Sequence, residues 1–472
     1  MTSPTQAETV KDEGTYRHLV TLALPLILGT ACQSLMLFTD RLYLNRIGAE
    51  ALAASFSATV FGYLCQCFFI GTAGYVAAFA AQHRGAGEHR RCGPWLGPAL
   101  GVALAGGAVG LALIPALPWI YGLMEPAPGV LEHMLTLGRW FLATTLPVTV
   151  IAGIGGFFAG IGRTGLALGL NIAVLLLNAG LNAVLAFGLD WGVQGVAIGA
   201  FLAATLVAVI ALAWVLSPGM HRAWGTRDLG SLGWSGLGRY LATAAPQGGR
   251  MLLEILSWTV FGFVLGRFGT VPLAASNIAI SWNMLTFIPM MGLSTAIAVA
   301  VGHALGGSRP DDVPGIVRRG LTLELAWAGF VAIPFVLTPG LLLLPFPPPA
   351  DLGADQAAAV ATLTATLLAV AALWGLGDAF NTAYSGALNG AGDTRWQLWA
   401  TLAGGIVLQW LPLALVLAGV VPFGLQPVVA AWLATLFFSV GMGVLMWWRF
   451  HTGAWRQRSL VAADLQGAES GS

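Results

Sequence analysis

The feature that most constrains this chain is a succession of twelve apolar runs of about 20 residues or more, separated by short stretches rich in Gly, Pro and charge. Only 9% of the residues are charged and 57% are hydrophobic, whereas an average soluble domain is about 25% charged. Lipid is therefore the solvent for most of the chain. Because lipid cannot hydrogen-bond an exposed backbone, runs of this length favour transmembrane α-helices.

We predict an all-α polytopic membrane protein with six spans in each half, in two pseudo-symmetric six-helix bundles. The predicted spans cover residues 16–44, 52–82, 95–121, 131–160, 164–188, 192–216, 238–266, 275–304, 315–344, 355–389, 394–420 and 426–450. They divide the chain into an amino-terminal lobe (16–216), a polar interlobe linker (217–235) and a carboxy-terminal lobe (236–450). Tails at 1–15 and 451–472 flank the two lobes.

The distribution of Arg and Lys over the loops predicts the orientation of the spans, because cytoplasmic loops hold an excess of positive charge. Sixteen of the 21 cationic residues lie in the two tails and in the loops after even-numbered spans. The opposite loops hold only Arg46 and Arg267. We therefore expect a multi-pass protein of the inner (plasma) membrane with both termini in the cytoplasm.

The two halves of the chain resemble each other in sequence. Residues 25–88 align without a gap on residues 246–309, and 14 of these 64 positions are identical. The identical positions include the run 52–55, which matches 273–276. An even number of spans per half makes the repeats parallel, and parallel repeats in transporters usually enclose a central cavity. We expect the functional residues to lie at that interface.

Polar side chains within the first half form two stripes. They are functional candidates, because an ionisable group at mid-bilayer costs about 2.5–3.5 kcal/mol. Gln33 and Asp40 share one face of the first span, and Asn171, Asn178 and Asn182 share one face of the fifth. Facing stripes would form a pocket of oxygen ligands for H⁺ or Na⁺. The alternative is that the amides only hold the helices together.

The second half has a longer polar stripe on the tenth span, and the seventh span has matching polar residues. The stripe consists of Trp374, Asp378, Asn381, Thr382, Ser385 and Asn389, and the seventh span contributes Glu254, Ser257 and Trp258. Carboxylates beside indole faces suit an organic cation. The predicted substrate-cavity residues are Gln33, Trp258, Trp374, Asn381, Thr382 and Ser385. The alternative for the two tryptophans is packing within the helix bundle.

The acids suggest a mechanism of exchange. A carboxylate without a partner in a dry site takes up a proton near neutral pH and releases it when a cation arrives. Competition at one acid is the simplest physical form of antiport. The opposing interpretation is that Arg41, next to Asp40, and Arg250, four residues before Glu254, neutralise these acids permanently.

Two further sets of residues are interpreted as structural. Glu324 lies in a predicted span, but pairing or snorkelling with Arg318 and Arg319 accounts for it. The four cysteines have no metal-ligand spacing, and no His cluster accompanies them. We therefore predict no metal site beyond a possible Na⁺ site, no catalytic residues and no cofactor other than the coupling ion, Na⁺ or H⁺.

Together these features resemble the multidrug and toxic compound extrusion (MATE) family, specifically its bacterial NorM-like branch, from about residue 16 to residue 450. The residues that support the resemblance are Leu24-Pro25-Leu26 with Gln33 and Asp40, Gly85-Ala86-Gly87, Asn178-Ala-Gly-Leu-Asn182 ending at Gly188, Glu254 after Pro246, Pro289-Met-Met-Gly292, and Gly390-Ala-Gly392-Asp393-Thr394-Arg395. No single motif is decisive. Their order, the twelve spans and the repeat are together specific.

The resemblance implies two six-helix bundles around a central cavity, alternating access driven by Na⁺ or H⁺, and amphipathic, often cationic, drugs as substrates. It implies an amino-lobe cation site at Asp40, Asn178 and Asn182, a carboxy-lobe cation site at Glu254 and Asp378, and a helix bend at Pro25. Because this chain has both sets of acids, the resemblance does not decide which of the two lobes binds the coupling ion. Asn182 replaces an Asp found in some relatives, which weakens a proton relay in the amino lobe.

Other functions fit the sequence less well. A flippase of a lipid-linked precursor has a similar two-lobe arrangement, but its anionic substrate calls for a basic cavity. A membrane-embedded enzyme is not supported, because the sequence shows no catalytic motif. A passive channel is not supported either, because no repeated filter-like loop at membrane depth is evident. We expect an antiporter that acts as a monomer in the lipid bilayer on small organic molecules, without a nucleic-acid partner.

Overall fold

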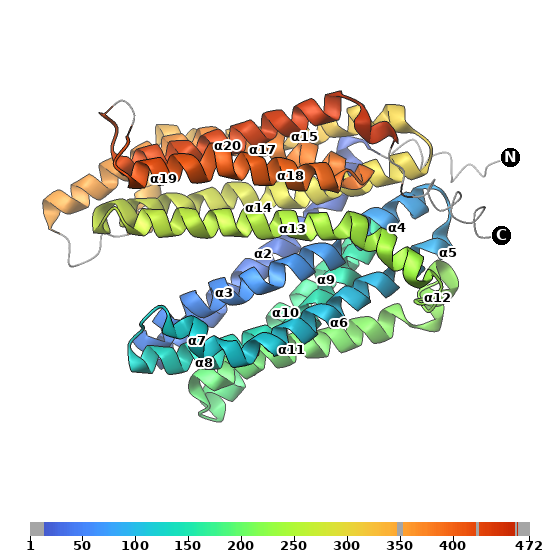
Figure 1. Cartoon of the computed structure of the whole chain (residues 1–472), viewed down its shortest axis with the longest axis horizontal. Helices are drawn as coiled ribbons and strands as arrows, with labels where there is room; N and C mark the ends of the chain where they lie inside the picture. Colours follow the sequence, from blue (N-terminus) through green and yellow to red (C-terminus); the bar gives the residue numbers. More distant parts are fainter. Residues whose placement is uncertain (1–13, 347–352, 422–423, 458–459, 461–472) are drawn as a thin grey trace. The chain divides into compact units, whose positions relative to one another are not determined.

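The computed structural model describes residues 14–346, 353–421, 424–457 and 460 (Figure 1). Most of the predicted amino-terminal tail (1–15) and much of the carboxy-terminal tail (451–472) lie outside the described residues. The fold is 88% helical, and the described residues contain no β-strand. The predicted all-α class is therefore confirmed.

The first half of the chain folds into helices that follow one another with short connections (Figure 1). They are α2 (Tyr16–Ile47), α3 (Ala49–Gly74), α4 (Val76–Gly85), α5 (His89–Cys92), η1 (Gly93–Trp95), α6 (Leu96–Leu113), η2 (Ile114–Ala116), α7 (Leu117–Gly122), α8 (Pro128–Ala143), α9 (Thr145–Gly160), α10 (Thr164–Ala183), η3 (Val184–Gly188) and α11 (Gly192–Val215). The short helix α12 (Pro218–Trp224) lies in the predicted linker.

The second half contains the three longest helices of the described chain. Its elements are α13 (Gly233–Gly266), α14 (Thr270–Gly306), η4 (Pro310–Asp312), α15 (Val313–Leu337), α16 (Pro339–Leu343), α17 (Ala354–Ala391), α18 (Thr394–Gly404), η5 (Gly405–Trp410), α19 (Leu411–Leu417), α20 (Pro427–His451) and η7 (Ala454–Gln457). Two segments, η3 and η5, have π-helical geometry.

Eleven helical segments of the described chain are long and apolar enough to cross a membrane. Helices α8 and α9 form a further candidate, bent by 41° where they meet. Each predicted apolar run corresponds to one of these segments or to the bent pair, with ends that differ by up to seven residues, as where the run predicted at 315–344 ends at Leu337. The chain is thus a multi-pass helical membrane protein, as predicted.

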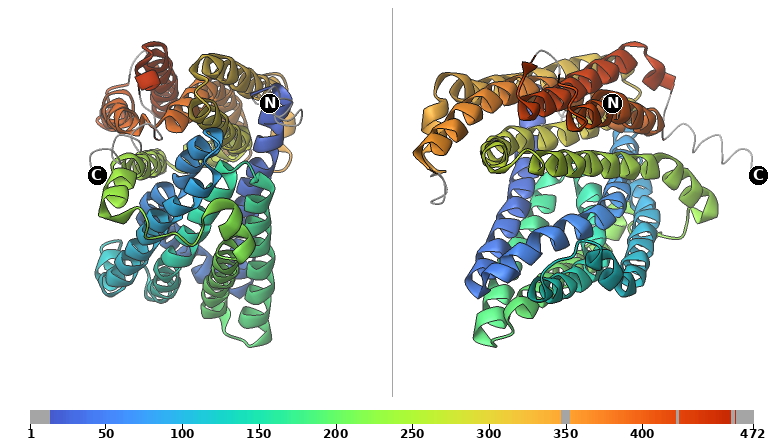
Figure 2. Two further views of the ribbon diagram at one scale, coloured as in Figure 1. Left: turned by 90° about the vertical axis from the view of Figure 1, so that its right-hand side faces the viewer. Right: turned by 60° about the vertical axis from the view of Figure 1, so that its left-hand side comes forward.

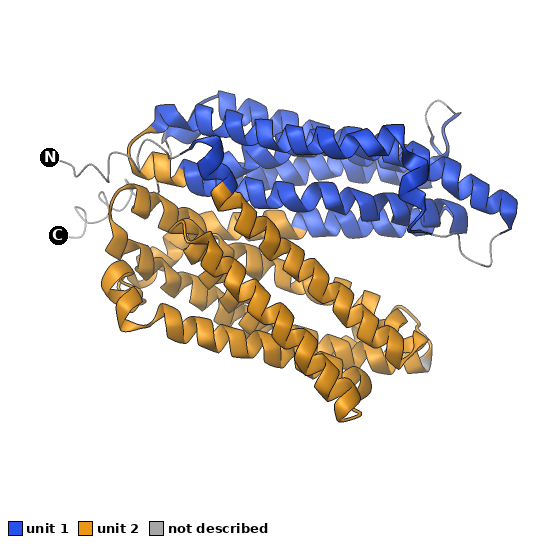
Figure 3. Cartoon of the chain, turned by 180° about the vertical axis from the view of Figure 1, so that it is seen from behind, with its two compact units in different colours: residues 1–20, 253–301, 310–458 blue, residues 21–252, 302–309, 459–472 orange. Residues whose placement is uncertain are grey.

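The helices form two compact units (Figure 3). Unit 1 consists of residues 1–20, 253–301 and 310–458, and unit 2 consists of residues 21–252, 302–309 and 459–472. Helices α2, α13 and α14 are each divided between the two units. Two further views show the long helices within each unit running side by side (Figure 2).

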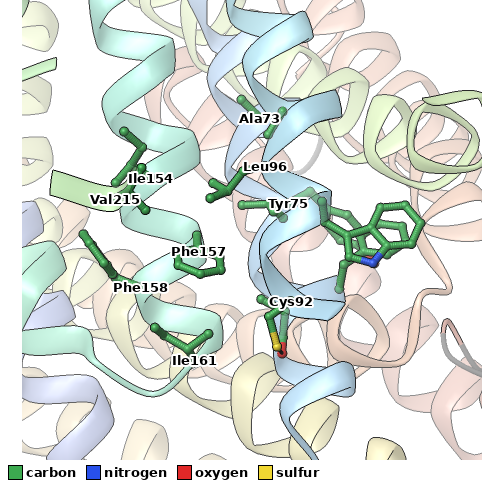
Figure 4. Close-up of a cluster of buried hydrophobic side chains, with 14 of the residues drawn as sticks. Ala73, Tyr75, Cys92, Leu96, Ile154, Phe157, Phe158, Ile161 and Val215 are labelled. Carbon is green, nitrogen blue, oxygen red and sulfur yellow. Dashed lines mark hydrogen bonds between the residues drawn. The ribbon is translucent and has the colours of Figure 1, made fainter. Parts of the chain in front are cut away.

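The core of unit 2 is rich in aromatic side chains. Phe79 and Trp95 stack with their ring centroids 4.2 Å apart, and Tyr240 donates a hydrogen bond of 2.7 Å to the carbonyl of Thr72. Figure 4 shows Phe157 among the side chains of this core. Aromatic rings buried against several helices fix how those helices pack.

The core of unit 1 also contains aromatic residues, contributed by α13, α17 and α20. Phe261, Trp374 and Trp432 are buried together, and the Trp432 indole donates to Ser276 Oγ at 3.1 Å. This cluster lies beside the acids of the second half. It positions the helices from which those acids project.

A small-residue contact recurs in both units at positions related by the repeat. Gly160 packs on the backbone of Ala77 in unit 2, and Gly390 packs on the backbone of Ala298 in unit 1. A Cβ at either glycine would collide with the carbonyl oxygen of its alanine. Ala77 and Ala298 are an identical pair of the sequence repeat. The repeat therefore preserves a close helix crossing.

Candidate functional site

Two hydrogen bonds between side chains join α2 to α10 within unit 2, in addition to one from the Tyr43 hydroxyl to the carbonyl of Ala179. Asn182 Nδ2 donates to Asp40 Oδ1 at 2.7 Å, and Gln33 Nε2 donates to Asn171 Oδ1 at 3.1 Å. The seven-residue spacing on α2 places Gln33 and Asp40 on the face that contacts α10. The structure thus brings together the polar side chains of these two helices.

Asn178 completes this cluster, which we call the Asp40 site (Asp40, Asn178 and Asn182). Its side chain is fully buried and lies beside the Asp40 carboxylate. Asn178 Nδ2 is within hydrogen-bonding reach of that carboxylate, whereas Oδ1 of Asn178 and Oδ1 of Asn182 have no hydrogen-bond partner in the described part of the chain. Each unsatisfied buried atom costs about 1–3 kcal/mol. Amide and carboxylate oxygens are ligands for a hard cation, which would supply the missing contacts.

The surroundings of the Asp40 site keep it compact and without a permanent positive charge. Gly199 of α11 packs directly on the Asn182 amide, where a Cβ would collide with Oδ1. Arg41 is exposed, and among the residues that the structure describes it makes no ion pair with Asp40. Permanent neutralisation of Asp40 by Arg41 is therefore not observed.

A second acidic site lies in unit 1 on α17; we call Glu254, Asp378, Thr382 and Ser439 the Asp378 site. Asp378 is buried, and Ser439 of α20 donates a hydrogen bond to its Oδ1. Trp374, one helical turn earlier, is within hydrogen-bonding reach of the same carboxylate. Glu254 of α13 is close enough for its charge to interact with that of Asp378.

Glu324 of α15 adjoins the Asp378 site, although the sequence analysis assigned it to pairing with arginines. Its side chain is 0% exposed, and Thr382 Oγ1 donates to its Oε2. Arg318 is exposed, and Arg319 donates to the carbonyl of Gly14 at 3.0 Å. The pairing interpretation is therefore wrong. The sequence signal that could have identified Glu324 is its position on the same helical face as the buried apolar residues of α15.

Glu324 is in register with the apolar residues that α15 buries. Ala328, Val331 and Phe335 follow it at helical spacing, and all three are buried. A carboxyl group in phase with such a stripe must point into the protein, whereas a snorkelling side chain needs a position near the polar face. The sequence spacing between Glu324 and the nearest arginines does not show whether the side chain points into the protein.

The two tryptophans predicted to line a substrate cavity pack against each other. Trp258 and Trp374 are stacked, with ring centroids 5.4 Å apart, and Trp374 is only 3% exposed. Phe261 and Trp432 pack on the edges of Trp374. The structure thus places Trp374 in the aromatic core of unit 1, beside the Asp378 carboxylate.

The remaining predicted residues make local contacts. Ser385 Oγ donates to Asn381 Oδ1 at 3.3 Å, Gln397 Nε2 donates to Asn389 Oδ1 at 2.9 Å, and Trp410 Nε1 donates to Ser257 Oγ at 3.1 Å. Arg250 donates to Gln247 Oε1 at 3.1 Å. Helix α2 continues through Pro25 without interruption. In the described residues, no three His, Cys, Asp or Glu side chains are grouped to hold a metal ion.

Comparison with known proteins gives consistent results over nearly the whole chain. The sequence profile of the MatE family matches residues 25–184 and again residues 246–415. A protein of Bradyrhizobium diazoefficiens described as a probable multidrug resistance protein NorM is 30% identical over 444 residues, which cover 89% of each chain. The multidrug resistance protein PmpM of Pseudomonas aeruginosa is 27% identical over 82% of this chain and 80% of its own length.

Solved structures share the fold. A multidrug resistance MATE family transporter in an outward-facing conformation matches with a TM-score of 0.81 at 17% identity, covering 93% of this chain and 96% of its own. The Vibrio cholerae MATE transporter VcmN in its bent form matches with a TM-score of 0.79 at 17% identity, covering 94% and 98%. The two profile matches begin at Pro25 and Pro246, where the internal repeat also begins. The chain therefore belongs to the multidrug and toxic compound extrusion (MATE) family, in its NorM-like branch, and is a membrane transporter rather than an enzyme.

Proposed function

We propose that this transporter is a cation-coupled antiporter that exports amphipathic, cationic organic compounds in exchange for Na⁺ or H⁺. The coupling cation binds at the Asp40 site and at Glu254 and Asp378 of the Asp378 site. The observation that best supports the proposal is the Asp40 site itself. Its carboxylate accepts a hydrogen bond from an amide, forms no ion pair with Arg41, and lies beside two buried amide oxygens that lack partners among the described residues.

The proposed exchange follows from the charge of these sites. A carboxylate in a dry surrounding is unfavourable unless a proton, Na⁺ or an organic cation neutralises it. Binding of the coupling ion and of a cationic substrate at the same acids is then mutually exclusive. Relatives described as multidrug resistance proteins support the substrate class.

The cycle we propose is alternating access by the lobes 16–216 and 236–450, in a monomer with both termini in the cytoplasm and no cofactor. The sites face the cytoplasm with substrate bound and the opposite side when the coupling ion displaces it. Residues Gln33, Asn381 and Ser385 contact the substrate in this scheme. The tryptophans act from behind the acids, where they keep water away from the carboxylates.

The test is dye efflux from proteoliposomes under separately imposed Na⁺ and H⁺ gradients. Wild-type protein should export a cationic dye under at least one gradient, and the effective gradient identifies the ion. Asp40→Asn and Glu254→Gln should each abolish export, because the neutral side chain no longer requires a counter-ion. Full export by both variants would contradict the assignment of Asp40 and Glu254 as coupling residues.

A matched control separates loss of the site from loss of fold. Asp355 is exposed in the first turn of α17, outside both acidic sites. Asp355→Asn makes the same chemical change as Asp40→Asn and should export dye as the wild type does. If Asp355→Asn also stops export, the assay reports on net charge or folding rather than on the coupling acids.

A further inference from the structure

We infer that Glu324 is a further proton-binding residue of the transport cycle, linked to the Asp378 site through the hydroxyl group of Thr382. This inference rests on the proposed function, because it adds a group to the same carboxy-terminal acidic site. It assigns the proton, rather than a metal ion, as the ligand of this group. Three observations support this inference: the Thr382 hydroxyl has more than one acceptor, Glu324 has no counter-charge among the described residues, and Glu324 Oε1 has no hydrogen-bond partner there.

The Thr382 hydroxyl has two close acceptors, and a third, the backbone carbonyl oxygen of Ala379, lies at 3.5 Å. Its Oγ1 lies within hydrogen-bond distance of Glu324 Oε2 and, at 2.6 Å, of the backbone carbonyl oxygen of Asp378. A hydroxyl group has one hydrogen and can donate to only one of these acceptors at a time. When it donates to the Asp378 carbonyl, the short contact with Glu324 requires a proton on the carboxyl group. When Glu324 is ionised, the hydroxyl must turn to it.

Among the residues that the structure describes, no positive charge forms an ion pair with Glu324. Helix α14 contains no Asp, Glu, Lys or Arg, and its one histidine lies near its C-terminal end. Helix α17 contributes only Asp355, at its start, and Asp378, whose charge acts on Glu324 unfavourably. Helix α16 has no charged residue, and η4 contributes the acids Asp311 and Asp312 at the far end of α15.

The arginines of α15 itself do not serve Glu324 either. Arg319 binds the carbonyl of Gly14, and Arg318 is exposed. A carboxylate here would therefore stand beside a second acid without a counter-charge, in a position closed to solvent. Burial of an unpaired charge is among the most unfavourable arrangements in a protein interior. A proton is the smallest group that removes this cost.

The free oxygen of Glu324 distinguishes a proton from a metal ion. Oε1 is buried and has no hydrogen-bond partner in the part of the chain that the structure describes. Na⁺ would need several oxygen ligands around it, as other hard cations do. Within the described residues, Thr382 Oγ1 is the one oxygen hydrogen-bonded to the carboxyl group, and the backbone N–H of Ala383, which is also within hydrogen-bonding reach of it, cannot bind a cation. A single acidic proton fits this arrangement.

The inferred step conserves atoms and charge. When the site opens to solvent and a cationic substrate arrives to neutralise the carboxylate, loss of the proton breaks one O–H bond of the Glu324 carboxyl group, leaves the carboxylate ionised and delivers H⁺ to the water admitted by that opening. The Thr382 hydroxyl then turns from the Asp378 carbonyl to Glu324 Oε2. The Thr382 backbone carbonyl accepts a hydrogen bond of 2.7 Å from Ser294 Oγ, which holds this part of α17 against α14 while the hydroxyl turns.

Infrared spectroscopy of the purified full-length protein tests the inference directly. A protonated carboxylic acid has a C=O stretch that a carboxylate lacks. The wild type should show such a band that disappears as the pH is raised or when tetraphenylphosphonium is added. Glu324→Gln should lack that band and lose proton-driven dye export. Glu132→Gln, the same change at an exposed position of α8, should keep both.

The outcomes separate this inference from the proposed function. If the wild type exports dye but Glu324→Gln has an unchanged spectrum and unchanged pH dependence of export, Glu324 is structural and the inference fails alone. A Glu324 band that never responds to pH or to the cation overturns it as well. If the wild type exports dye under neither gradient, the proposed function fails instead. Should Glu324→Gln not fold, Glu324→Asp should shift the band and retain part of the export.

Discussion

At the scale of single residues, the Asp40 site shows how a glycine, which has no side chain, lets a helix backbone pack against a polar group and hold it in place. The Asn182 amide is fixed on one side by its hydrogen bond to Asp40 and on the other by the backbone of Gly199. The Asn182 Oδ1 atom has no hydrogen-bond partner among the described residues, so on that side the amide is held by its packing against Gly199. Gly199 is therefore a positioning residue of the site.

We predict that Gly199→Ala weakens coupling without changing the charge of the site. The added methyl group would displace the Asn182 amide and break its hydrogen bond to the Asp40 carboxylate. A hydrogen bond to a charged group contributes about 1.5–3 kcal/mol, so cation affinity should fall by roughly 10- to 100-fold. The measurement is the gradient needed for half-maximal dye export in proteoliposomes.

Gly180→Ala provides the matched control for Gly199→Ala. Gly180 lies on α10, between Asn178 and Asn182, and a Cβ there would meet open space. Its export should therefore equal that of the wild type. Equal export by Gly199→Ala and Gly180→Ala would show that the orientation of the Asn182 amide does not matter for coupling.

Sequence patterns predicted which polar residues of unit 2 share a face, because helical periodicity fixes the direction of each side chain on α2 and α10. These patterns did not predict the hydrogen-bond partners of the polar residues on α17. Asp378 bonds to Ser439 of α20, whereas Thr382, one turn later, bonds to Glu324 of α15. One apparent stripe is therefore shared between two neighbouring helices. That division depends on helix packing, which hydrophobic periodicity does not record.

At the scale of helices, the repeat identifies the closest crossings. The identical pair Gly85 and Gly306 lies at the crossing of the α4 and α14 termini in unit 2. A Cβ at Gly85 would collide with the carbonyl oxygen of His303, and a Cβ at Gly306 with that of Gln82. Both obstacles are backbone atoms, which cannot move aside as a flexible side chain can.

We predict that Gly85→Ala and Gly306→Ala each destabilise the folded protein, because the two helices must separate to admit a methyl group. Overpacking of this kind costs about 1–3 kcal/mol. The expected result is a lower midpoint of thermal unfolding in detergent. Gly101→Ala, on α6 where a Cβ would meet open space, should leave the midpoint unchanged. An equal fall in all three variants would reflect helix composition rather than the crossing.

Helix boundaries were the part of the fold that the sequence predicted best. The run predicted at 164–188 is α10 with η3, and the run predicted at 192–216 is α11. Gly, Pro and charged residues mark where an apolar run meets the interface, which explains this agreement. The 41° bend between α8 and α9 was not predicted, since it lies inside one continuous apolar run.

At the scale of the whole molecule, the exposed surface is explained by lipid. Large apolar side chains are exposed on many helices, including Phe330 at 67%, Leu104 at 65% and Leu337 at 73%. A soluble protein rarely exposes apolar surface to this extent. The charged residues are concentrated in loops instead, and their asymmetry between odd and even loops predicts which side of the membrane each loop faces.

Reporter fusions test that orientation. Green fluorescent protein folds only in the cytoplasm, and alkaline phosphatase is active only outside it. A fusion at the Gly87 loop, after the second span, should fluoresce and lack phosphatase activity, whereas a fusion at the Gly269 loop, after the seventh span, should behave oppositely. Because Arg46 and Arg267 are the only cations in the loops predicted to lie outside, adding arginines beside Gly269 should weaken that contrast. Phosphatase activity at Gly87 would invert the predicted topology and, with it, the direction in which the Asp40 and Asp378 sites first meet their substrate.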